Sequence, residues 1–82
     1  MIVSQEEALA SIRRERQNLE WINKSLSSLR EKFGDRYIAV HDRQVIDSDE
    51  QFERLFARIR KLEHPESVTI EYVTTLEYLW ML

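Results

Sequence analysis

Residues 4–33 read SQEEALASIRRERQNLEWINKSLSSLREKF, a helical pattern about thirty residues long in a chain of 82. Ser4 and Glu7 form a capping-box pattern, which predicts the first turn of the helix. Gly34 is expected to end it, because glycine adopts the left-handed C′ conformation without steric cost. Such a helix would run roughly 45 Å, whereas a compact globule of this chain length is on the order of 30 Å across. It must therefore protrude, bend, or pack along a second chain.

The apolar residues of this stretch recur at spacings of three, four and seven, which is the pattern of a heptad seam. The seam is interrupted where the chain has Glu15 and Arg16 instead of an apolar residue. Residues 23–28 have poor helix propensity, so a kink or a second helix capped by Asn23 or Ser25 is the alternative to one continuous helix. The seam consists of Ala8, Ile12, Leu19, Ile22, Leu26, Leu29 and Phe33, and Trp21 widens it.

Two short strands are predicted after the helix. Residues 37–40 and 45–46 are apolar and β-branched, which favours an antiparallel hairpin with a two-residue turn at Asp42-Arg43. Arg43 is unusual there, because the second turn position favours Gly or Asn for its positive φ. We expect either strain of about 1 kcal/mol or a slightly longer loop.

A second helix and a third strand are predicted beyond the hairpin. The helix is expected to end at His64-Pro65, because the residue before proline avoids the α region. Residues 68–73 alternate as a half-buried strand, with Val68, Ile70 and Tyr72 on one face and Thr69 and Glu71 on the other. The helix signals are two capping boxes from Asp47, Ser48, Glu50 and Gln51, followed by apolar Phe52, Leu55, Phe56, Ile59 and Leu62.

The expected fold is a single α+β domain, residues 1–82. A long helix at 4–33 contributes to oligomerisation, and a ββαβ body at 36–82 carries an aromatic C-terminal tail. If the third strand lies beside the first, the sheet is wholly antiparallel and the second helix covers one face. Half of the long helix can share that face, and the other half then has nothing to pack against within its own chain.

Composition excludes several classes of function. The chain has no Cys, which removes disulfides, thiolate zinc sites and thiol nucleophiles. It shows neither a signal peptide nor a membrane-spanning run, so a cytosolic protein is expected. The net charge is −3: residues 1–33 carry six Lys/Arg against five Glu, and residues 34–82 carry six against ten Asp/Glu. An acidic body disfavours nucleic acid as the main partner.

Residues 76–82 form an aromatic and apolar tail, LEYLWML. Exposed, it would be an apolar patch that soluble monomers rarely tolerate. It is too short to span a bilayer and lacks a basic flank for a membrane surface. The tail either forms a fourth strand in its own sheet or packs against a second chain, and capture by an unrelated protein is a third alternative. Tyr78, Trp80 and Leu82 alternate as they would in a strand.

No catalytic, cofactor or metal site is expected. The sequence has no glycine-rich phosphate loop and no nucleophile elbow. His41 and His64 are interpreted as exposed turn histidines, because neither has a second ligand at metal-binding spacing. The only basic cluster, Arg13, Arg14 and Arg16, is interpreted as a solvated helix face balanced by neighbouring glutamates.

From about Leu26 onward, the pattern resembles a known family. A helix ending Lys32-Phe33-Gly34 is followed by strand 37–40, a tight turn, Val45-Ile46, an acid-capped helix and the strand Ile70-Glu71-Tyr72-Val73. This order is similar to that of short prokaryotic, largely archaeal, domains of unknown function. The chain departs from that family at its turn, which lacks the usual Gly-containing pair, and in its N-terminal extension. The resemblance implies the fold and carries over no catalytic residue.

These observations favour a non-catalytic protein–protein interaction or assembly module, expected to be a homodimer. The alternative is a nucleic-acid-linked regulator, antitoxin-like or transcription-associated, that uses Arg13, Arg14 and Arg16. A third hypothesis is an accessory subunit of a larger enzyme. The residues expected at the interface are Ile12, Leu19, Trp21, Ile22, Leu26, Tyr78, Trp80 and Leu82.

Overall fold

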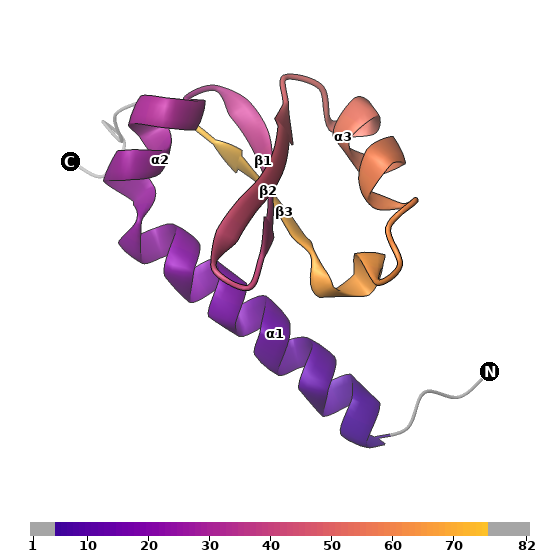
Figure 1. Ribbon diagram of the computed structural model, residues 1–82. Helices are drawn as coiled ribbons and strands as arrows, with labels where there is room; N and C mark the ends of the chain where they lie inside the picture. The colour runs from indigo at the N-terminus through magenta and orange to yellow at the C-terminus, as the bar shows by residue number, and fades with distance from the viewer. Residues whose placement is uncertain (1–4, 76–82) are drawn as a thin grey trace.

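The computed structural model has three layers, with helices on both faces of a three-stranded antiparallel sheet (Figure 1). It describes the backbone of residues 5–75 and the side chains of residues 9–75. The expected Ser4–Glu7 capping box and the tail, with its possible fourth strand, therefore lie outside the described residues. The predicted α+β class is confirmed. The elements are α1 (Gln5–Lys24), α2 (Leu26–Phe33), β1 (Arg36–His41), β2 (Gln44–Asp49), α3 (Phe52–Ile59), the 3₁₀ helix η1 (Pro65–Ser67) and β3 (Thr69–Val73).

The N-terminal helical stretch is kinked at Ser25. The backbone of Ser25 leaves helical geometry, with φ −101° and ψ 9°. Its N–H still donates to the carbonyl oxygens of Trp21 and Ile22, at 3.0 and 3.2 Å, and its own carbonyl accepts from the N–H of Leu29 at 2.9 Å. The low helix propensity of residues 23–28 thus produces a bend and not a helical hairpin. The bend keeps both Ile22 and Leu29 against the sheet, where they are 7% and 4% exposed.

Gly34 ends α2 for a reason other than the expected left-handed conformation. Its φ is −55°, and the left-handed residue is the next one, Asp35, with φ 60°. A Cβ on Gly34 would lie 2.6 Å from Cγ2 of Thr75 and 2.7 Å from the carbonyl oxygen of Arg30. Glycine is required here because the end of α2 approaches the chain after β3 too closely for any side chain.

β1 is the central strand, with β2 on one side and β3 on the other, both antiparallel to it. The hairpin has the tight two-residue turn: His41 pairs with Gln44, and Asp42 and Arg43 have φ values of 49° and 58°. The structure thus has the strained two-residue turn, with positive φ at Arg43, and not the longer loop that was the alternative. β2 is also longer than the two residues predicted.

A β-bulge interrupts the hairpin. Ala39 pairs with Asp47 while Val40 pairs with Val45, so Ile46 is an extra residue in β2 without a partner in β1. Ile46 is 43% exposed, although it is large and apolar.

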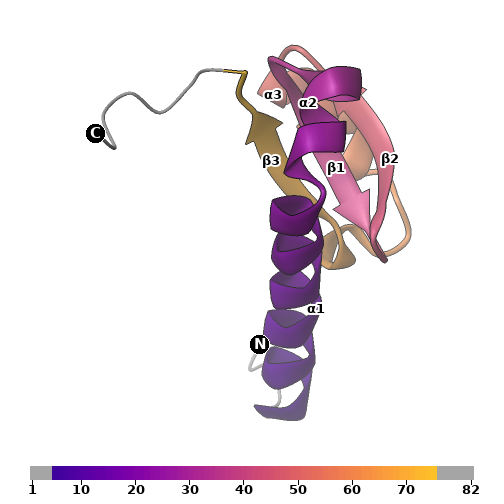
Figure 2. The same cartoon turned by 90° about the vertical axis from the view of Figure 1, so that its left-hand side faces the viewer.

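The core consists of two clusters on opposite faces of the sheet. Residues Ile38, Ala39 and Val40 of β1 are completely buried, and side chains of successive strand residues point to opposite faces. Both faces therefore need cover, and α1 and α2 lie on one face while α3 lies on the other (Figure 2). The expectation that the N-terminal helix shares the face of α3 was wrong. One cluster contains Ile22, Leu29, Ile38, Val40 and Val73, and the other contains Ala39, Leu55 and Ile59.

α3 is shorter than predicted and begins differently. It ends at Ile59, after which the N–H of Leu62 donates to the carbonyl oxygen of Ile59 at 3.0 Å in a 3₁₀-type turn. The predicted capping boxes are absent: the N-cap residue Gln51 makes no side-chain cap bond. Asp49, the last residue of β2, accepts the N–H of Gln51 at 2.9 Å instead.

β3 follows its predicted alternation. Val68 and Ile70 pack on the cluster that α3 covers, whereas Val73 belongs to the cluster beneath α1 and α2. Within residues 5–75, no helix combines the length and apolar character needed to cross a bilayer.

Candidate interaction surfaces

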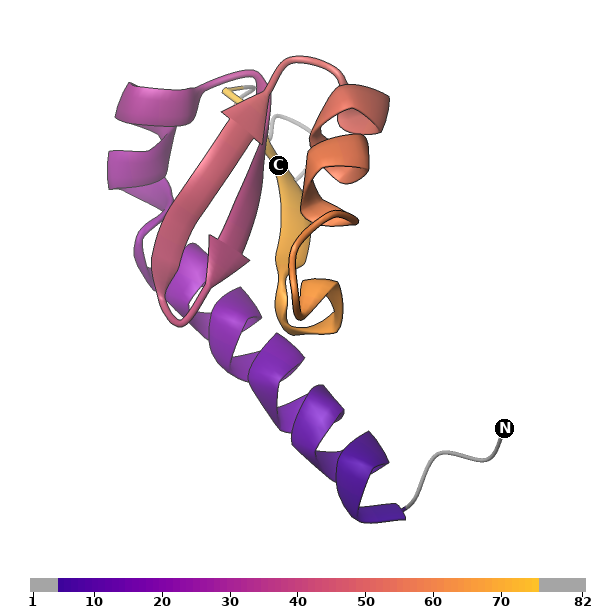
Figure 3. The ribbon, with the colours of Figure 1, turned by 45° about the vertical axis from the view of Figure 1, so that its right-hand side comes forward.

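The first half of α1 projects beyond the sheet as an arm (Figures 1 and 3). α1 has 20 residues and is therefore about 30 Å long, and the molecule measures 44 Å along its longest axis. Leu9 and Ile12 are 48% and 53% exposed, and Leu19 is half-buried. Helical spacing places these three residues, here called the arm strip, along one side of the helix. A shallow groove of about 270 Å³ follows this side and is lined by Ile12, Glu15, Arg16, Leu19, Glu20 and Asn23.

The other helical residues expected at an interface lie nearer the sheet. Ile22 belongs to the core of its own chain, so its side chain is not available to a second chain. Trp21 is half-buried and packs against the same cluster, and Leu26 is half-buried just after the kink. The tail residues Tyr78, Trp80 and Leu82 lie outside the described residues.

Asn18 fixes α1 to the body, a role that sequence reasoning missed. It is 3% exposed. Its Nδ2 donates to the carbonyl oxygen of Val40 at 3.3 Å, to that of Ser67 at 3.4 Å and to Oγ1 of Thr69 at 3.0 Å. One buried amide thus contacts β1, η1 and β3. Its position four residues before Ile22 is the only signal in the sequence that places it on the core side.

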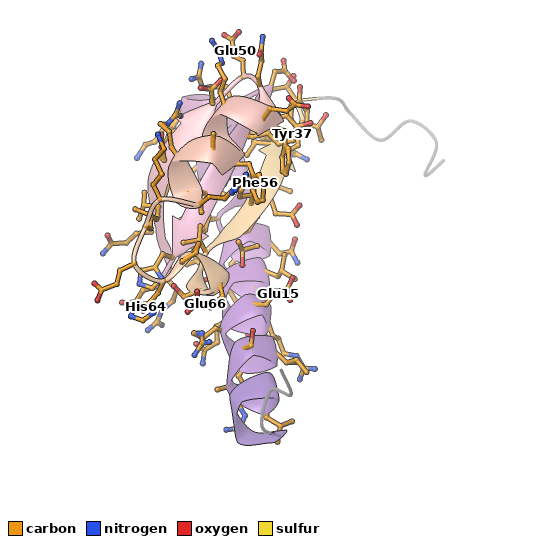
Figure 4. All side chains as sticks on the ribbon, turned by 90° about the vertical axis from the view of Figure 1, so that its right-hand side faces the viewer. Glu15, Tyr37, Glu50, Phe56, His64 and Glu66 are labelled. Carbon is orange, nitrogen blue, oxygen red and sulfur yellow. The ribbon has the colours of Figure 1, made fainter. Side chains whose placement is uncertain are left out.

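Four aromatic rings form a ladder on the α3 side of the molecule. Two of them, Tyr37 and Phe56, are labelled in Figure 4. Ring centroids of Tyr72 and Tyr37 are 4.9 Å apart, those of Tyr37 and Phe52 5.6 Å, and those of Phe52 and Phe56 5.5 Å. The guanidinium of Arg60 lies 5.7 Å from the Phe56 centroid. Phe52, Phe56 and Tyr72 remain 40 to 46% exposed. The helical period placed Phe52 and Phe56 on the same apolar face as Leu55 and Ile59. Of these four residues, only Leu55 and Ile59 are buried.

Two aspartates of β2 hold α3 in place. Arg58 binds Asp47 through two nitrogens, at 2.8 and 3.1 Å, and reaches Asp49 at 3.0 Å. Arg54 binds Asp49 at 2.9 Å. The pKa of Asp49 is lowered to about 2, chiefly by the hydrogen bond from the Gln51 N–H and then by the two arginines. The pKa of Asp47 is also lowered, chiefly by Arg58. These charges are satisfied internally and serve the fold.

The two histidines, far apart in the sequence, line one hollow of about 500 Å³. Nδ1 of His41 lies 3.2 Å from Oγ and 3.4 Å from the carbonyl oxygen of Ser67. Nδ1 of His64 lies 3.2 Å from Oε1 of Glu66. Both histidines are exposed, as predicted, but their proximity was not foreseen. The hollow is lined by Arg14, His41, Ile46, Leu62, His64, Glu66, Ser67 and Val68.

The three arginines of the basic cluster do not form one stripe. All are exposed, but Arg14 lines the hollow and Arg16 lines the arm groove. Successive helical residues are rotated by about 100°, so Arg13 and Arg14 face different directions. Among residues whose side chains are described, no three His, Asp or Glu are close enough together to hold a metal ion.

Comparison with known protein families gives a match to more than half of the chain. A family described as "Family of unknown function (DUF5678)" matches residues 28–75. The matched segment starts within α2 and includes the whole sheet and α3, whereas α1 lies before it. No curated protein and no solved structure matches the chain.

Proposed function

The chain belongs to the DUF5678 family of unknown function, and because the family match begins after α1, we propose that α1 is this chain's own device for joining two copies. In this proposal the protein is a non-catalytic assembly module that acts as a homodimer. The two arms form the interface, and the sheet with α3 is the unit that they bring together.

The exposed arm strip carries this proposal. Leu9 and Ile12 are about half exposed on a helix that extends beyond the sheet. Apolar side chains on such a projection find cover when the same surface of a second copy packs against them. A two-fold axis achieves this with a single self-complementary patch and leaves no open surface.

The sequence of the arm favours an antiparallel crossing centred between Glu15 and Arg16. This register places Ile12 of one copy opposite Leu19 of the other, and Glu15 opposite Arg16. Two apolar contacts then flank two ion pairs of opposite charge. The interruption of the heptad seam, which weakens the strip within one chain, becomes the centre of the dimer, where charged pairs fix register.

Light scattering tests the dimer directly. The wild-type protein is expected at twice its chain mass of 9.9 kDa, and Ile12→Glu is expected at the single-chain mass with an unchanged circular dichroism spectrum. Gln17→Glu is the matched control, because it adds the same charge to an exposed position on another side of α1. A wild-type protein that stays at 9.9 kDa at micromolar concentration, or an Ile12→Glu mass equal to that of the wild type, would contradict the proposal.

A charge exchange tests the register. Glu15→Arg places two arginines opposite each other and is expected to raise the dimer dissociation constant about tenfold, equivalent to about 1.4 kcal/mol. Adding Arg16→Glu to the same protein exchanges the two charges and is expected to restore the wild-type constant. If the double variant is as weak as the single one, the two residues do not face each other.

Two further measurements separate this proposal from its rivals. A version lacking residues 76–82 is expected to remain dimeric if the arm alone drives association, whereas loss of the dimer would assign the interface to the tail. Retention on mixed DNA or RNA that falls with salt and with the Arg13/Arg14/Arg16→Ala change would support the nucleic-acid alternative instead.

A further inference from the structure

The hollow that contains both histidines is built from four separate parts of the chain. Arg14 comes from α1, His41 from the end of β1, Ile46 from β2, and the segment 62–68 from the turn after α3 and from η1. Its volume is about 500 Å³, which lies in the range of small-molecule sites. Figure 4 shows His64 and Glu66 near each other at the end of the body beside α1.

The apolar part of the hollow is unusual in its exposure. Ile46 and Leu62 are 43% and 44% exposed, and Val68 lines the same hollow. Ile46 is the extra residue of the β-bulge, and bulges redirect side chains next to functional sites. Large exposed aliphatic side chains that line one hollow favour an apolar ligand group between them.

The polar part of the hollow consists of Arg14, the two histidines, Glu66 and Ser67. Arg14 is exposed and supplies a positive charge there. Both imidazoles are held by contacts at Nδ1, His41 to Ser67 and His64 to Glu66. The Ser67 hydroxyl already donates to the carbonyl oxygen of His64, so Oγ and the carbonyl oxygen of Ser67 are acceptors for His41, and the carboxylate of Glu66 is an acceptor for His64. In a neutral ring the proton therefore lies on Nδ1 and Nε2 is an acceptor, which leaves Arg14 as the anion-binding group of the hollow.

Glu66 is an internal competitor for the positive charge of Arg14. Its carboxylate lies 3.2 Å from Nδ1 of His64, and its side chain is 58% exposed. The pKa of Glu66 is lowered, first by the hydrogen bond of its own backbone N–H and then by His64 and the charge of Arg14. A negative group in the hollow therefore already interacts with Arg14, the residue that would hold an external anion.

From this geometry we propose that the hollow binds a small organic anion, a phosphate or carboxylate carried on an apolar group. Arg14 holds the anionic oxygens, His41 and His64 line the site beside it, and Ile46, Leu62 and Val68 contact the apolar group. Glu66 weakens binding by competing for Arg14. This site is independent of the proposed dimer and is tested without reference to it.

Titration of the full chain, followed by ¹H–¹⁵N NMR, tests the proposal with three probes of similar size. Phenyl phosphate and benzoate distinguish a phosphate from a carboxylate, and uncharged benzyl alcohol measures the apolar contribution. At least one anion is expected to shift the amide signals of Arg14, Ile46 and residues 62–68 with a millimolar dissociation constant. Benzyl alcohol is expected to bind about tenfold more weakly, because it lacks the charge-assisted hydrogen bonds.

Variants give the sharper test. Arg14→Gln is expected to weaken anion binding about tenfold, whereas Arg13→Gln, which removes the same charge one residue away, changes it less than about twofold. Glu66→Gln is expected to tighten binding several-fold, and such a gain cannot come from misfolding. The proposal is overturned if neither anion shifts these signals at about 10 mM, a concentration that reveals even weak sites. It is also overturned if benzyl alcohol binds equally well, if the two arginine variants behave alike, or if Glu66→Gln weakens binding.

Discussion

Asn18 shows how one polar side chain sets the position of a helix. Its amide donates hydrogen bonds to Val40, Ser67 and Thr69 from a buried position. Asn18→Ala is expected to destabilise the protein by about 2 kcal/mol, because it leaves buried acceptors without a donor. Urea unfolding followed by circular dichroism measures this change.

Gln17 provides the control for that experiment. It is the adjacent residue of α1 and is exposed. Gln17→Ala is expected to change stability by less than about 0.5 kcal/mol. Equal effects of the two substitutions would mean that the loss reflects helix propensity and not the buried amide.

The lowered pKa of Asp49 predicts how the stability of the fold depends on pH. Its folded-state pKa is about 2, below the ordinary 3.8, so its ionised form stabilises the fold above pH 3.8. This contribution is lost as the pH falls from 3.8 toward 2. Asp49→Asn is therefore expected to be less stable than the wild type at neutral pH, and the difference should shrink across that interval. Thermal unfolding from pH 7 to pH 2 measures it.

Glu50, the acidic residue next to Asp49 in the sequence, provides the control for this prediction. Among the described residues, it forms an ion pair with Arg36 at 3.5 Å, and its side chain is 70% exposed. Glu50→Gln is expected to change stability by less than about 0.5 kcal/mol at neutral pH. A wild-type advantage over Asp49→Asn that persists unchanged at pH 2 would show that the charge of Asp49 is not responsible.

Among the elements, the β1–β2 hairpin carries strain that can be relieved. Arg43 has φ 58°, a conformation that costs a residue with a Cβ about 1 kcal/mol. Arg43→Gly is expected to raise the free energy of unfolding by up to about that amount. Arg43→Ala removes the same side chain without relieving φ, and it is expected to give no gain. Chemical denaturation measures the free energy of unfolding of the wild type and of the two variants. A higher value for Arg43→Ala than for the wild type would mean that the arginine side chain, and not the positive φ, destabilises the turn.

Most elements were predictable because each depends on local pattern. The hairpin turn, the strand at 68–73 and the apolar positions Leu55 and Ile59 all follow from residues near one another in the sequence. The kink at Ser25 was predicted as one of two alternatives, because propensity shows that a helix is weak but not which bend results. The face that α1 covers could not be predicted, since it depends on the burial of both faces of β1. The role of Gly34 likewise depends on Thr75, which is distant in the sequence.

The two candidate sites, the arm and the hollow, also differ in whether residues close together in the sequence form them. Two residues of the exposed arm strip, Ile12 and Leu19, were visible in the heptad spacing, because a helix face is a local property. Leu9 was not among the predicted seam or interface residues. The hollow was not visible, because Arg14, His41 and His64 meet only in the folded chain and the bulge at Ile46 has no marker such as glycine. Each histidine alone had suggested an exposed turn residue, and each is exposed.

For the whole molecule, β1 couples the two helical layers. Leu55 is fully buried against its α3 face, and Ile22 is buried on the other face. Leu55→Ala is expected to cost about 2–5 kcal/mol, a large share of the stability of a small domain. Because β1 contributes to both clusters, hydrogen exchange at Ile22 is expected to accelerate by the same factor as exchange at Ile59.

Phe56→Ala is the control for that substitution, since Phe56 neighbours Leu55 in α3 but is 43% exposed. It is expected to cost about 1 kcal/mol through its ring contacts. Unchanged exchange at Ile22 in Leu55→Ala would mean that the α1 layer remains folded when the α3 layer opens.

The chain enters the sheet and leaves it at one corner. The carboxylate of Asp35 accepts hydrogen bonds from Oγ1 of Thr75 at 3.0 and 2.9 Å, and the N–H of Asp35 donates to the carbonyl oxygen of Val73 at 2.6 Å. Gly34 lies in contact with the same threonine. This corner closes a loop of chain from residue 34 to residue 75, and α2 ends at the same point and covers the sheet face that Ile22 and Leu29 bury. Any excised domain must therefore keep the helices before Gly34, because residues 34–75 alone would expose that face to water.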